Sequence, residues 1–139
     1  MASLFPVVCV DELEGPCDFY LRLLGMKVVF QVDWYVQLQD PADPTLQIAF
    51  VSRAHESVPA AFRQRCQGVI VTLERDDVDG VHARARELGL PVHTPLRDEP
   101  WGQRHFITED PAGLLVDVVK LIPPDASYAD GYLGDRAPR

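Results

Sequence analysis

The chain has 139 residues, a hydrophobic content of 47% and a formal net charge of −8. This size and apolar content suit one domain with a sizeable core, so no second domain is expected. The negative charge repels phosphate backbones and anionic lipid, which excludes nucleic acid and membrane surfaces as expected partners. No leader pattern opens the chain, and no run reaches the roughly 18 apolar residues of a membrane-spanning helix, which predicts a cytoplasmic protein. Its cysteines, Cys9, Cys17 and Cys66, lack a CxxC spacing and are expected to be reduced thiols.

The first part of the chain has the pattern of a strand, a helix and three further strands. Residues 4–10 are rich in β-forming side chains. Residues 13–24 carry an apolar stripe at helical spacing, which Gly25 ends. The stripe consists of Leu13, Cys17, Tyr20, Leu21 and Leu24. Turn residues then separate three short apolar segments, which predict strands at 26–32, 34–39 and 45–51.

The second part of the chain repeats this order. Residues 52–66 are polar and are expected to form a linker with a short helical piece near 59–65. Asp76 and Asp77 are suited to cap a helix, which Gly89 ends. Its apolar positions are Val78, Val81, Ala85 and Leu88. Strands are predicted at 68–74, 90–95, 104–110 and 113–120, the last two joined by the turn Asp110-Pro111-Ala112-Gly113.

A local echo supports an internal repeat. The segment Leu24-Gly25-Met26-Lys27-Val28 is matched 64 residues later by Leu88-Gly89-Leu90-Pro91-Val92. Coincidence between two ordinary helix ends would explain the echo alone, but the shared order of elements favours a repeat. We therefore predict an α+β fold in a single domain, residues 1–139, with two βαβββ modules forming curved half-sheets around a cleft. The predicted parts are a first module (4–52), a linker (53–66), a second module (67–121) and a C-terminal tail (122–139).

These motifs resemble the vicinal oxygen chelate superfamily, the group of glyoxalases, bleomycin-resistance proteins and extradiol dioxygenases. The resemblance rests on Asp18-Phe19-Tyr20 through Leu24-Gly25-Met26 and on Trp101-Gly102-Gln103-Arg104 through Asp110-Pro111-Ala112-Gly113. It covers roughly residues 4–121 and implies the paired βαβββ fold.

The resemblance also implies where a metal would bind. In metal-using members, four side chains at set strand positions hold a divalent ion that polarises a substrate with two neighbouring oxygens. These positions fall here on Phe5, Ala49, Val69 and Asp117, and a shift of one residue at the first three supplies no ligand. One carboxylate cannot repay the dehydration of a hard cation, so we predict a protein without metal or other cofactor. Misalignment would leave His55, His93 and His105 as other donors.

Metal-free members with a Trp-Gly-Gln-Arg stretch resemble antibiotic-binding resistance proteins of the bleomycin and mitomycin type. Those proteins hold a drug between aromatic faces, commonly at a dimer interface, without changing it. The resemblance, together with the residue types, predicts a ligand-binding set and no catalytic residue. The set is Trp101, Trp34, Asp117, Gln103, Arg104, Phe50 and Gln47.

Each member of the set has a functional and a structural interpretation. The tryptophans would stack on a planar ligand, or they would be core or interface residues. The glutamines would supply neutral donors and acceptors, or they would face solvent. Phe50 would make the cleft floor apolar or pack in the core. Asp117 would bind a ligand cation or hydroxyl or act as a general base, or it would be hydrogen-bonded to Arg104 or His105.

The predicted function is a metal-independent homodimer that sequesters a small molecule, a planar or cationic antibiotic or natural product. Two alternatives stay open. One is a metal-free isomerase or lyase of the same fold, with Asp117 or His105 in proton transfer. The other is an accessory protein that uses the fold only for dimerisation.

Overall fold

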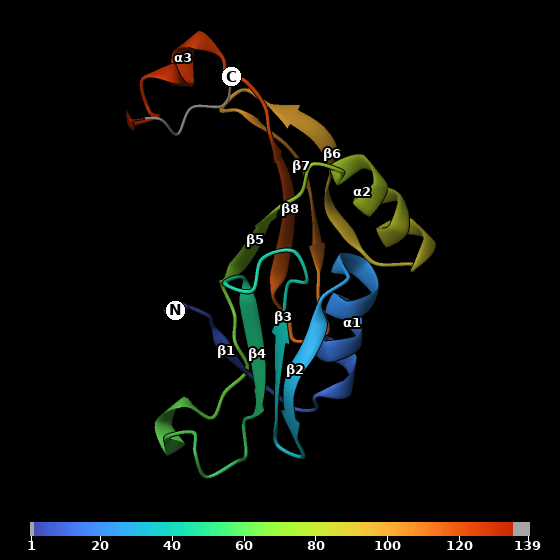
Figure 1. Ribbon diagram of the computed structural model, residues 1–139, viewed down its shortest axis with the longest axis vertical. Helices are drawn as coiled ribbons and strands as arrows, with labels where there is room; N and C mark the ends of the chain where they lie inside the picture. Colours follow the sequence, from blue (N-terminus) through green and yellow to red (C-terminus); the bar gives the residue numbers. More distant parts are fainter. Residues whose placement is uncertain (1, 135–139) are drawn as a thin grey trace. The chain divides into compact units, whose positions relative to one another are not determined.

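The computed structural model describes residues 2–134 and confirms the predicted α+β architecture (Figure 1). Its contacts divide the chain into two compact units. The first comprises residues up to Val69 together with Asp110–Leu114, and the second comprises Ile70–Glu109 and the chain from Leu115 onward. Met1 and residues 135–139, which belong to the predicted domain and tail, lie outside the described residues.

The first module has the predicted order of strand, helix and three strands. Its sheet runs β1-β4-β3-β2, with β1 parallel to β4 and the other pairs antiparallel. The elements are β1 (Val7–Val10), α1 (Glu14–Leu24), β2 (Lys27–Val32), β3 (Tyr35–Gln39) and β4 (Gln47–Ser52). The first strand is shorter than predicted, because Pro6 has no N–H to donate to a ladder.

Helix α1 begins at Glu14, and the carboxylate of Glu12 just before it accepts a hydrogen bond of 3.0 Å from the N–H of Gly15. The helix ends at Leu24, and the following Gly25 has the left-handed φ of 67° expected at a helix C-terminus. The helix is rotated from the predicted stripe, and its buried face consists of Pro16, Phe19, Tyr20, Leu23 and Leu24. Two apolar stripes with helical spacing overlap in this segment, the predicted one and the buried one. Packing against the sheet buries the stripe with the larger side chains.

The register of the first sheet separates its two faces. Phe50 contacts Tyr20 of α1, so alternate positions from Phe50 pack beneath the helix. The other positions include Val7 and Gln37, which both pair with Ala49. We call the face that carries Val7, Gln37 and Ala49 the open face of the first sheet.

The second module repeats the plan with sheet order β5-β8-β7-β6. Its elements are β5 (Ile70–Glu74), α2 (Val78–Glu87), β6 (Val92–Glu99), β7 (Gln103–Glu109) and β8 (Leu115–Leu121). The carboxylate of Asp77 caps α2 by accepting from the N–H of Gly80, as its position in the sequence indicated. A 3-10 turn, η1 (Ala60–Phe62), lies in the linker, and a short helix, α3 (Ala126–Ala129), lies in the tail.

Strand β6 continues four residues beyond its predicted end at Pro95. It is the outer strand of its sheet, where a proline is tolerated, and its register shifts between Thr94 and Arg97. This extension brings Glu99 into the sheet opposite Gln103.

Among residues 2–134, no helix is both long and apolar enough to cross a membrane.

Candidate functional site

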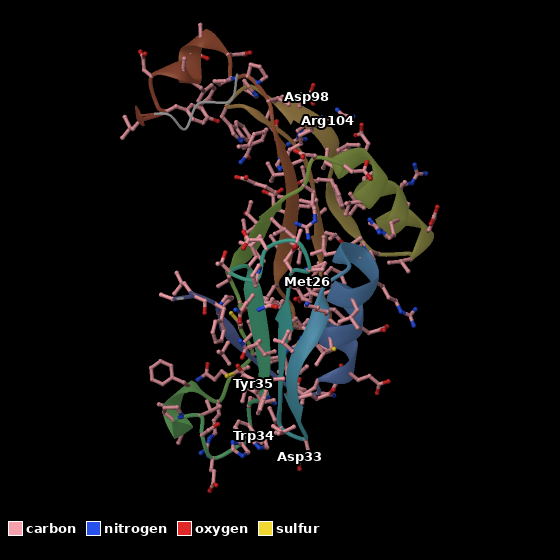
Figure 2. All side chains as sticks on the ribbon, in the orientation of Figure 1. Met26, Asp33, Trp34, Tyr35, Asp98 and Arg104 are labelled. Atoms are coloured by element: carbon pink, nitrogen blue, oxygen red, sulfur yellow. The ribbon has the colours of Figure 1, made fainter. Side chains whose placement is uncertain are left out.

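An apolar hollow of about 630 Å³ lies on the open face of the first sheet. Aromatic side chains from the β2–β3 hairpin form one side of it, and Figure 2 shows Trp34 and Tyr35 at the end of this hairpin. Its lining residues are Val7, Cys9, Phe30, Trp34, Tyr35, Gln37, Val51, Ser57, Val58 and Pro59. Its size lies within the range that small-molecule pockets occupy.

The aromatic side chains of the hollow are held in place by their neighbours. The ring centroids of Trp34 and His55 are 3.7 Å apart and the rings are nearly parallel, at 3°. The Phe30 and Tyr35 rings meet edge to face at 5.9 Å. One face of the Trp34 indole is therefore already covered by His55, which the sequence had indicated only as a possible metal donor.

A row of polar side chains crosses the open face beside these rings. The Tyr35 hydroxyl donates to Oε1 of Gln37 over 2.8 Å, and Nε2 of Gln37 donates to Oε1 of Gln47. Burial raises the pKa of Tyr35, so its hydroxyl stays neutral at physiological pH. Gln47 thus supports Gln37, which lines the hollow, and is not itself a lining residue.

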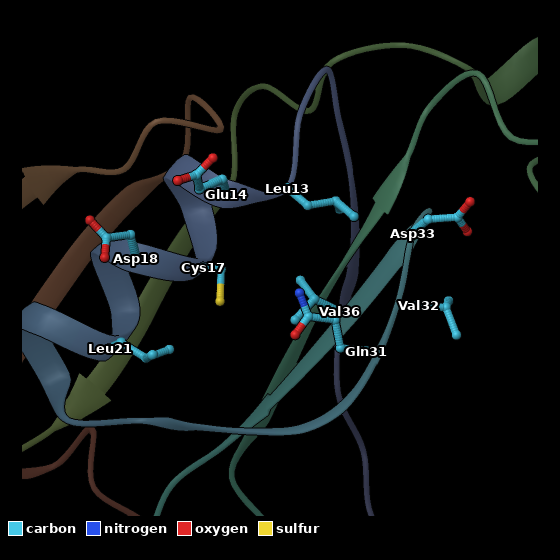
Figure 3. Close-up of a pocket in the computed structure, with 9 residues that line it drawn as sticks. All are labelled: Leu13, Glu14, Cys17, Asp18, Leu21, Gln31, Val32, Asp33 and Val36. Atoms are coloured by element: carbon cyan, nitrogen blue, oxygen red, sulfur yellow. The ribbon is translucent and has the colours of Figure 1, made fainter.

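A second hollow, of about 420 Å³, lies between α1 and the β2–β3 hairpin (Figure 3). Leu13, Cys17 and Leu21, which do not belong to the buried face of α1, line it. Its lining also includes three carboxylates, Glu14, Asp18 and Asp33. Burial and the neighbouring charge of Asp18 raise the pKa of the Cys17 thiol, which makes it a weak nucleophile.

A buried charged cluster occupies the face of the second sheet opposite α2. Nδ1 of His105 lies 2.7 Å from Oδ1 of Asp117, and its Nε2 lies 2.9 Å from Oε2 of Glu99. The side chains of His105, Glu99 and Asp117 are 5%, 10% and 12% exposed. Ionised carboxylates only accept hydrogen bonds, so both ring nitrogens donate and His105 is an imidazolium.

The pKa of His105 agrees with this geometry. Burial lowers the pKa of this imidazole, but hydrogen bonds to Glu99 and Asp117 outweigh burial and raise it above the ordinary value of 6.5. The hydrogen bond from His105 lowers the pKa of Glu99, which Arg97 also lowers. With both nitrogens engaged, His105 has no free position from which to take a proton from a substrate.

Trp101 and Gln103 lie beside this cluster. The indole Nε1–H of Trp101 donates to Oε1 of Gln103 over 2.8 Å, and its ring meets the His105 ring edge to face at 6.2 Å. The backbone oxygen of Trp101 accepts from the hydroxyl of Tyr132 in the tail. The structure thus brings together three predicted residues: Trp101 and Gln103 directly, and Asp117 through His105.

Two predicted residues lie elsewhere. Phe50 is fully buried beneath α1, because adjacent residues of a strand point to opposite faces and Ala49 points to the open one. The Arg104 guanidinium bonds to Asp79 of α2 at 2.9 Å and to Asp98 at 3.0 Å, on the face that α2 covers (Figure 2). Asp117 is therefore bonded to His105 and not to Arg104.

The residues at the metal-binding strand positions do not fit a divalent ion. Phe5 and Val69 precede their strands, and the register places Val7 opposite Ala49 and Thr72 opposite Asp117. The only carboxylate among these side chains already accepts from His105. In the described part of the chain, no group of three or more His, Cys, Asp or Glu side chains is arranged to hold a metal ion.

Comparison with known proteins places the chain among related sequences and folds. The sequence profile of the Glyoxalase/Bleomycin resistance protein/Dioxygenase superfamily matches residues 4–118. No curated protein matches the chain in sequence.

Several solved structures share the fold. A member of the same superfamily from Sphaerobacter thermophilus DSM 20745 is 25% identical, with a TM-score of 0.69 over 86% of this chain and 98% of that one. TnmS3, an antibiotic binding protein from Streptomyces sp. CB03234, is 22% identical, with a TM-score of 0.66 over 87% and 96%. A lactoylglutathione lyase from Agrobacterium tumefaciens is 21% identical, with a TM-score of 0.66 over 86% and 92%.

Proposed function

This chain belongs to the Glyoxalase/Bleomycin resistance protein/Dioxygenase superfamily, and from that premise we propose that it sequesters a small planar natural product, such as an antibiotic, without changing it. The observation that carries the proposal is the apolar hollow on the open face of the first sheet, where Phe30, Trp34 and Tyr35 lie together. Such rings stack on planar molecules and lose little conformational entropy in doing so. The fold shared with the antibiotic binding protein TnmS3 supports this function.

The proposed binding is independent of a divalent metal. Of the four positions where the resemblance places metal ligands, Phe5, Ala49 and Val69 carry apolar side chains, and Asp117 is the remaining one. That carboxylate already accepts from His105, so a metal would have to break this hydrogen bond and would gain a single oxygen ligand.

We expect a planar compound of the bleomycin or mitomycin type to quench the tryptophan fluorescence of the protein and to be recovered unchanged. The Phe30→Ala substitution should weaken binding about tenfold, since it removes one wall of the hollow and leaves both tryptophans as reporters. Fluorescence titration gives the affinity, and mass spectrometry of the incubated compound tests its chemical fate. A chelator added to the titration should leave the affinity unchanged.

The matched control is Phe62→Ala. Phe62 is an exposed phenylalanine like Phe30, with exposed fractions of 73% and 54%, but only Phe30 lines the hollow. Equal losses in the two variants would argue against this binding site, and turnover of the compound would favour an enzyme.

The dimer predicted from the resemblance is also part of this proposal. β2 is an outer strand of its sheet, and Val28, Val29 and Phe30 on it are exposed in the chain. An exposed apolar outer strand favours pairing with another chain. We expect light scattering to give the mass of two chains and Val29→Lys to shift the protein toward the monomer. Leu133→Lys, at an exposed apolar position outside the strands, should leave the dimer intact.

The metal-free isomerase or lyase is the second candidate, and the pair formed by His105 and Asp117 favours it. A histidine oriented by a carboxylate is the usual arrangement of a general base. It ranks lower because Glu99 engages the second nitrogen.

A further inference from the structure

The lining of the apolar hollow has no charged side chain, although the chain carries a net charge of −8. Its polar groups are the side chains of Cys9, Tyr35, Gln37 and Ser57 and the indole N–H of Trp34, and none of these residue types is an ordinary ion. We propose that the ligand of this hollow is an uncharged aromatic molecule. This inference rests on the proposed function and narrows it to one class of ligand.

Three polar side chains of the hollow, those of Tyr35, Gln37 and Ser57, already have partners within the protein. Tyr35 donates to Gln37, and Gln37 donates to Gln47. The Ser57 hydroxyl lies 2.8 Å from Nδ1 of His55. A charged ligand would lose hydration in this hollow and would find no ion to replace it, which makes its binding less favourable. A neutral aromatic molecule has no charge to desolvate and is stabilised by the burial of its rings.

The overall negative charge of the chain would favour a cationic ligand. Whether a cationic or a neutral ligand binds better depends on two effects of different range, the attraction by distant carboxylates and the cost of desolvating the ligand. Attraction by distant carboxylates is screened within roughly 8 to 10 Å at physiological salt. The desolvation cost acts on the ligand wherever it is bound. The local lining therefore determines the preference, and the second hollow, with Glu14, Asp18 and Asp33, shows what a lining suited to a cation contains.

The stacked His55 restricts how the ligand can lie. Because this imidazole covers one face of the Trp34 indole, the ligand contacts the remaining face or edge together with Phe30 and Tyr35. The hollow thus favours a flat molecule held on one side of the tryptophan over one sandwiched between two rings.

The cysteines allow an experiment that reports each hollow separately. Cys9 lines the apolar hollow. Cys17 lines the second hollow, which we call the acidic hollow because Glu14, Asp18 and Asp33 line it, and Cys66 lines neither. All three are free thiols. Alkylation by iodoacetamide, read at each cysteine by peptide mass spectrometry, would be followed with three probes of one ring system. These are naphthylmethanol, naphthylmethylammonium and naphthoate.

We expect the neutral alcohol to slow the alkylation of Cys9 with an affinity at least about tenfold tighter than that of either charged probe. Cys66 should react at its usual rate with all three. Of the two hollows, only the one beside α1 has carboxylates in its lining, so protection by the ammonium probe should fall on Cys17 and not on Cys9.

A charge placed in the hollow provides the decisive variant. Gln37→Glu should reverse the preference at Cys9 from the alcohol to the ammonium ion, because a carboxylate then supplies the missing counter-ion. Gln39→Glu adds the same charge to the same face of β3 but lies outside the hollow, and it should keep the preference for the alcohol. Unfolding curves confirm that both variants are folded.

The outcomes separate this inference from the proposed function. Protection of Cys9 by the ammonium ion or naphthoate as strong as that by the alcohol would overturn the inference and leave small-molecule binding in place. No protection of Cys9 by any probe, at any concentration reached, would count against both. Alkylation of Cys9 that slows with rising protein concentration, whether or not a probe is present, would mean that a second copy of the chain covers the hollow. That result would also overturn the inference.

Discussion

The His105→Leu substitution is expected to lower the free energy of unfolding at pH 6 by about 2 to 3 kcal/mol. It removes an imidazolium that is nearly buried and leaves the carboxylate of Asp117 without its partner, 2.7 Å away. Breaking a fully buried ion pair costs more than this. The loss is smaller here because the carboxylate keeps some access to solvent. Urea denaturation of both proteins gives the difference.

The pH dependence of this difference has a definite sign. Because the folded pKa of His105 is raised, its contribution is fully present below the ordinary pKa of 6.5 and is lost as pH rises through the raised value. The difference in the free energy of unfolding between the parent and His105→Leu should therefore become smaller as the pH rises through the raised pKa of His105. A gap that widened with rising pH would show that His105 is neutral in the folded protein.

His93 offers a matched control for this prediction. It also lies 3.0 Å from a carboxylate, that of Glu109, but the two side chains are 49% and 45% exposed. Exposed ion pairs contribute little to stability, so His93→Leu should change the free energy of unfolding far less than His105→Leu. Equal effects would mean that burial of the His105 cluster does not determine its contribution.

The order of the elements could be predicted from the sequence because it rests on local patterns. The apolar spacing of 13–24 and 78–88, with Gly25 and Gly89 behind them, indicated both helices. The turn at Asp110–Gly113 indicated the last hairpin. Neighbouring residues determine these features, and so the structure confirms them.

The composition of the sites depends on contacts that local patterns do not contain. A difference of one residue decides whether Ala49 or Phe50 lies on the open face of the first sheet, and strand register is set by pairing with distant strands. Pro95 appeared to end β6, and this concealed Glu99 as a partner of His105. A signal was present in Gly102, since glycine is favoured in tight turns that need a positive φ, and this residue adopts a φ of 107° between β6 and β7.

The sequence also could not predict which side chains would contact one another over a long separation along the chain. No pattern around His55 assigns it a role, yet its ring lies parallel to that of Trp34. Likewise, the sequence allowed Asp117 to bond to Arg104 or His105. Adjacent residues on a strand point to opposite faces, so only the register could decide between them.

Asp110→Ala is expected to lower the free energy of unfolding by about 2 to 4 kcal/mol, since it strips two buried donors of their acceptor. Asp110, which belongs to the first unit with α1, is buried and accepts from the Tyr20 hydroxyl over 2.6 Å and from the N–H of Leu114 over 2.9 Å. The turn and the helix therefore share one carboxylate. Denaturation of the variant beside the parent measures the loss.

Conservative variants of this pair test whether the hydrogen bonds carry the effect. Burial raises the pKa of Asp110, against the hydrogen bonds from Tyr20 and the backbone, so the ionised group carries a desolvation cost that asparagine avoids. Asp110→Asn should therefore lower the free energy of unfolding less than Asp110→Ala does. Tyr20→Phe should also lower it less than Asp110→Ala, because the carboxylate keeps its backbone donors.

The control is Asp43→Ala, which removes a carboxylate from the less buried turn at Thr45. It should lower the free energy of unfolding much less. If Asp110→Ala costs no more than Asp43→Ala, the buried carboxylate does not join the turn to α1 energetically, and the packing of Tyr20 alone holds them together.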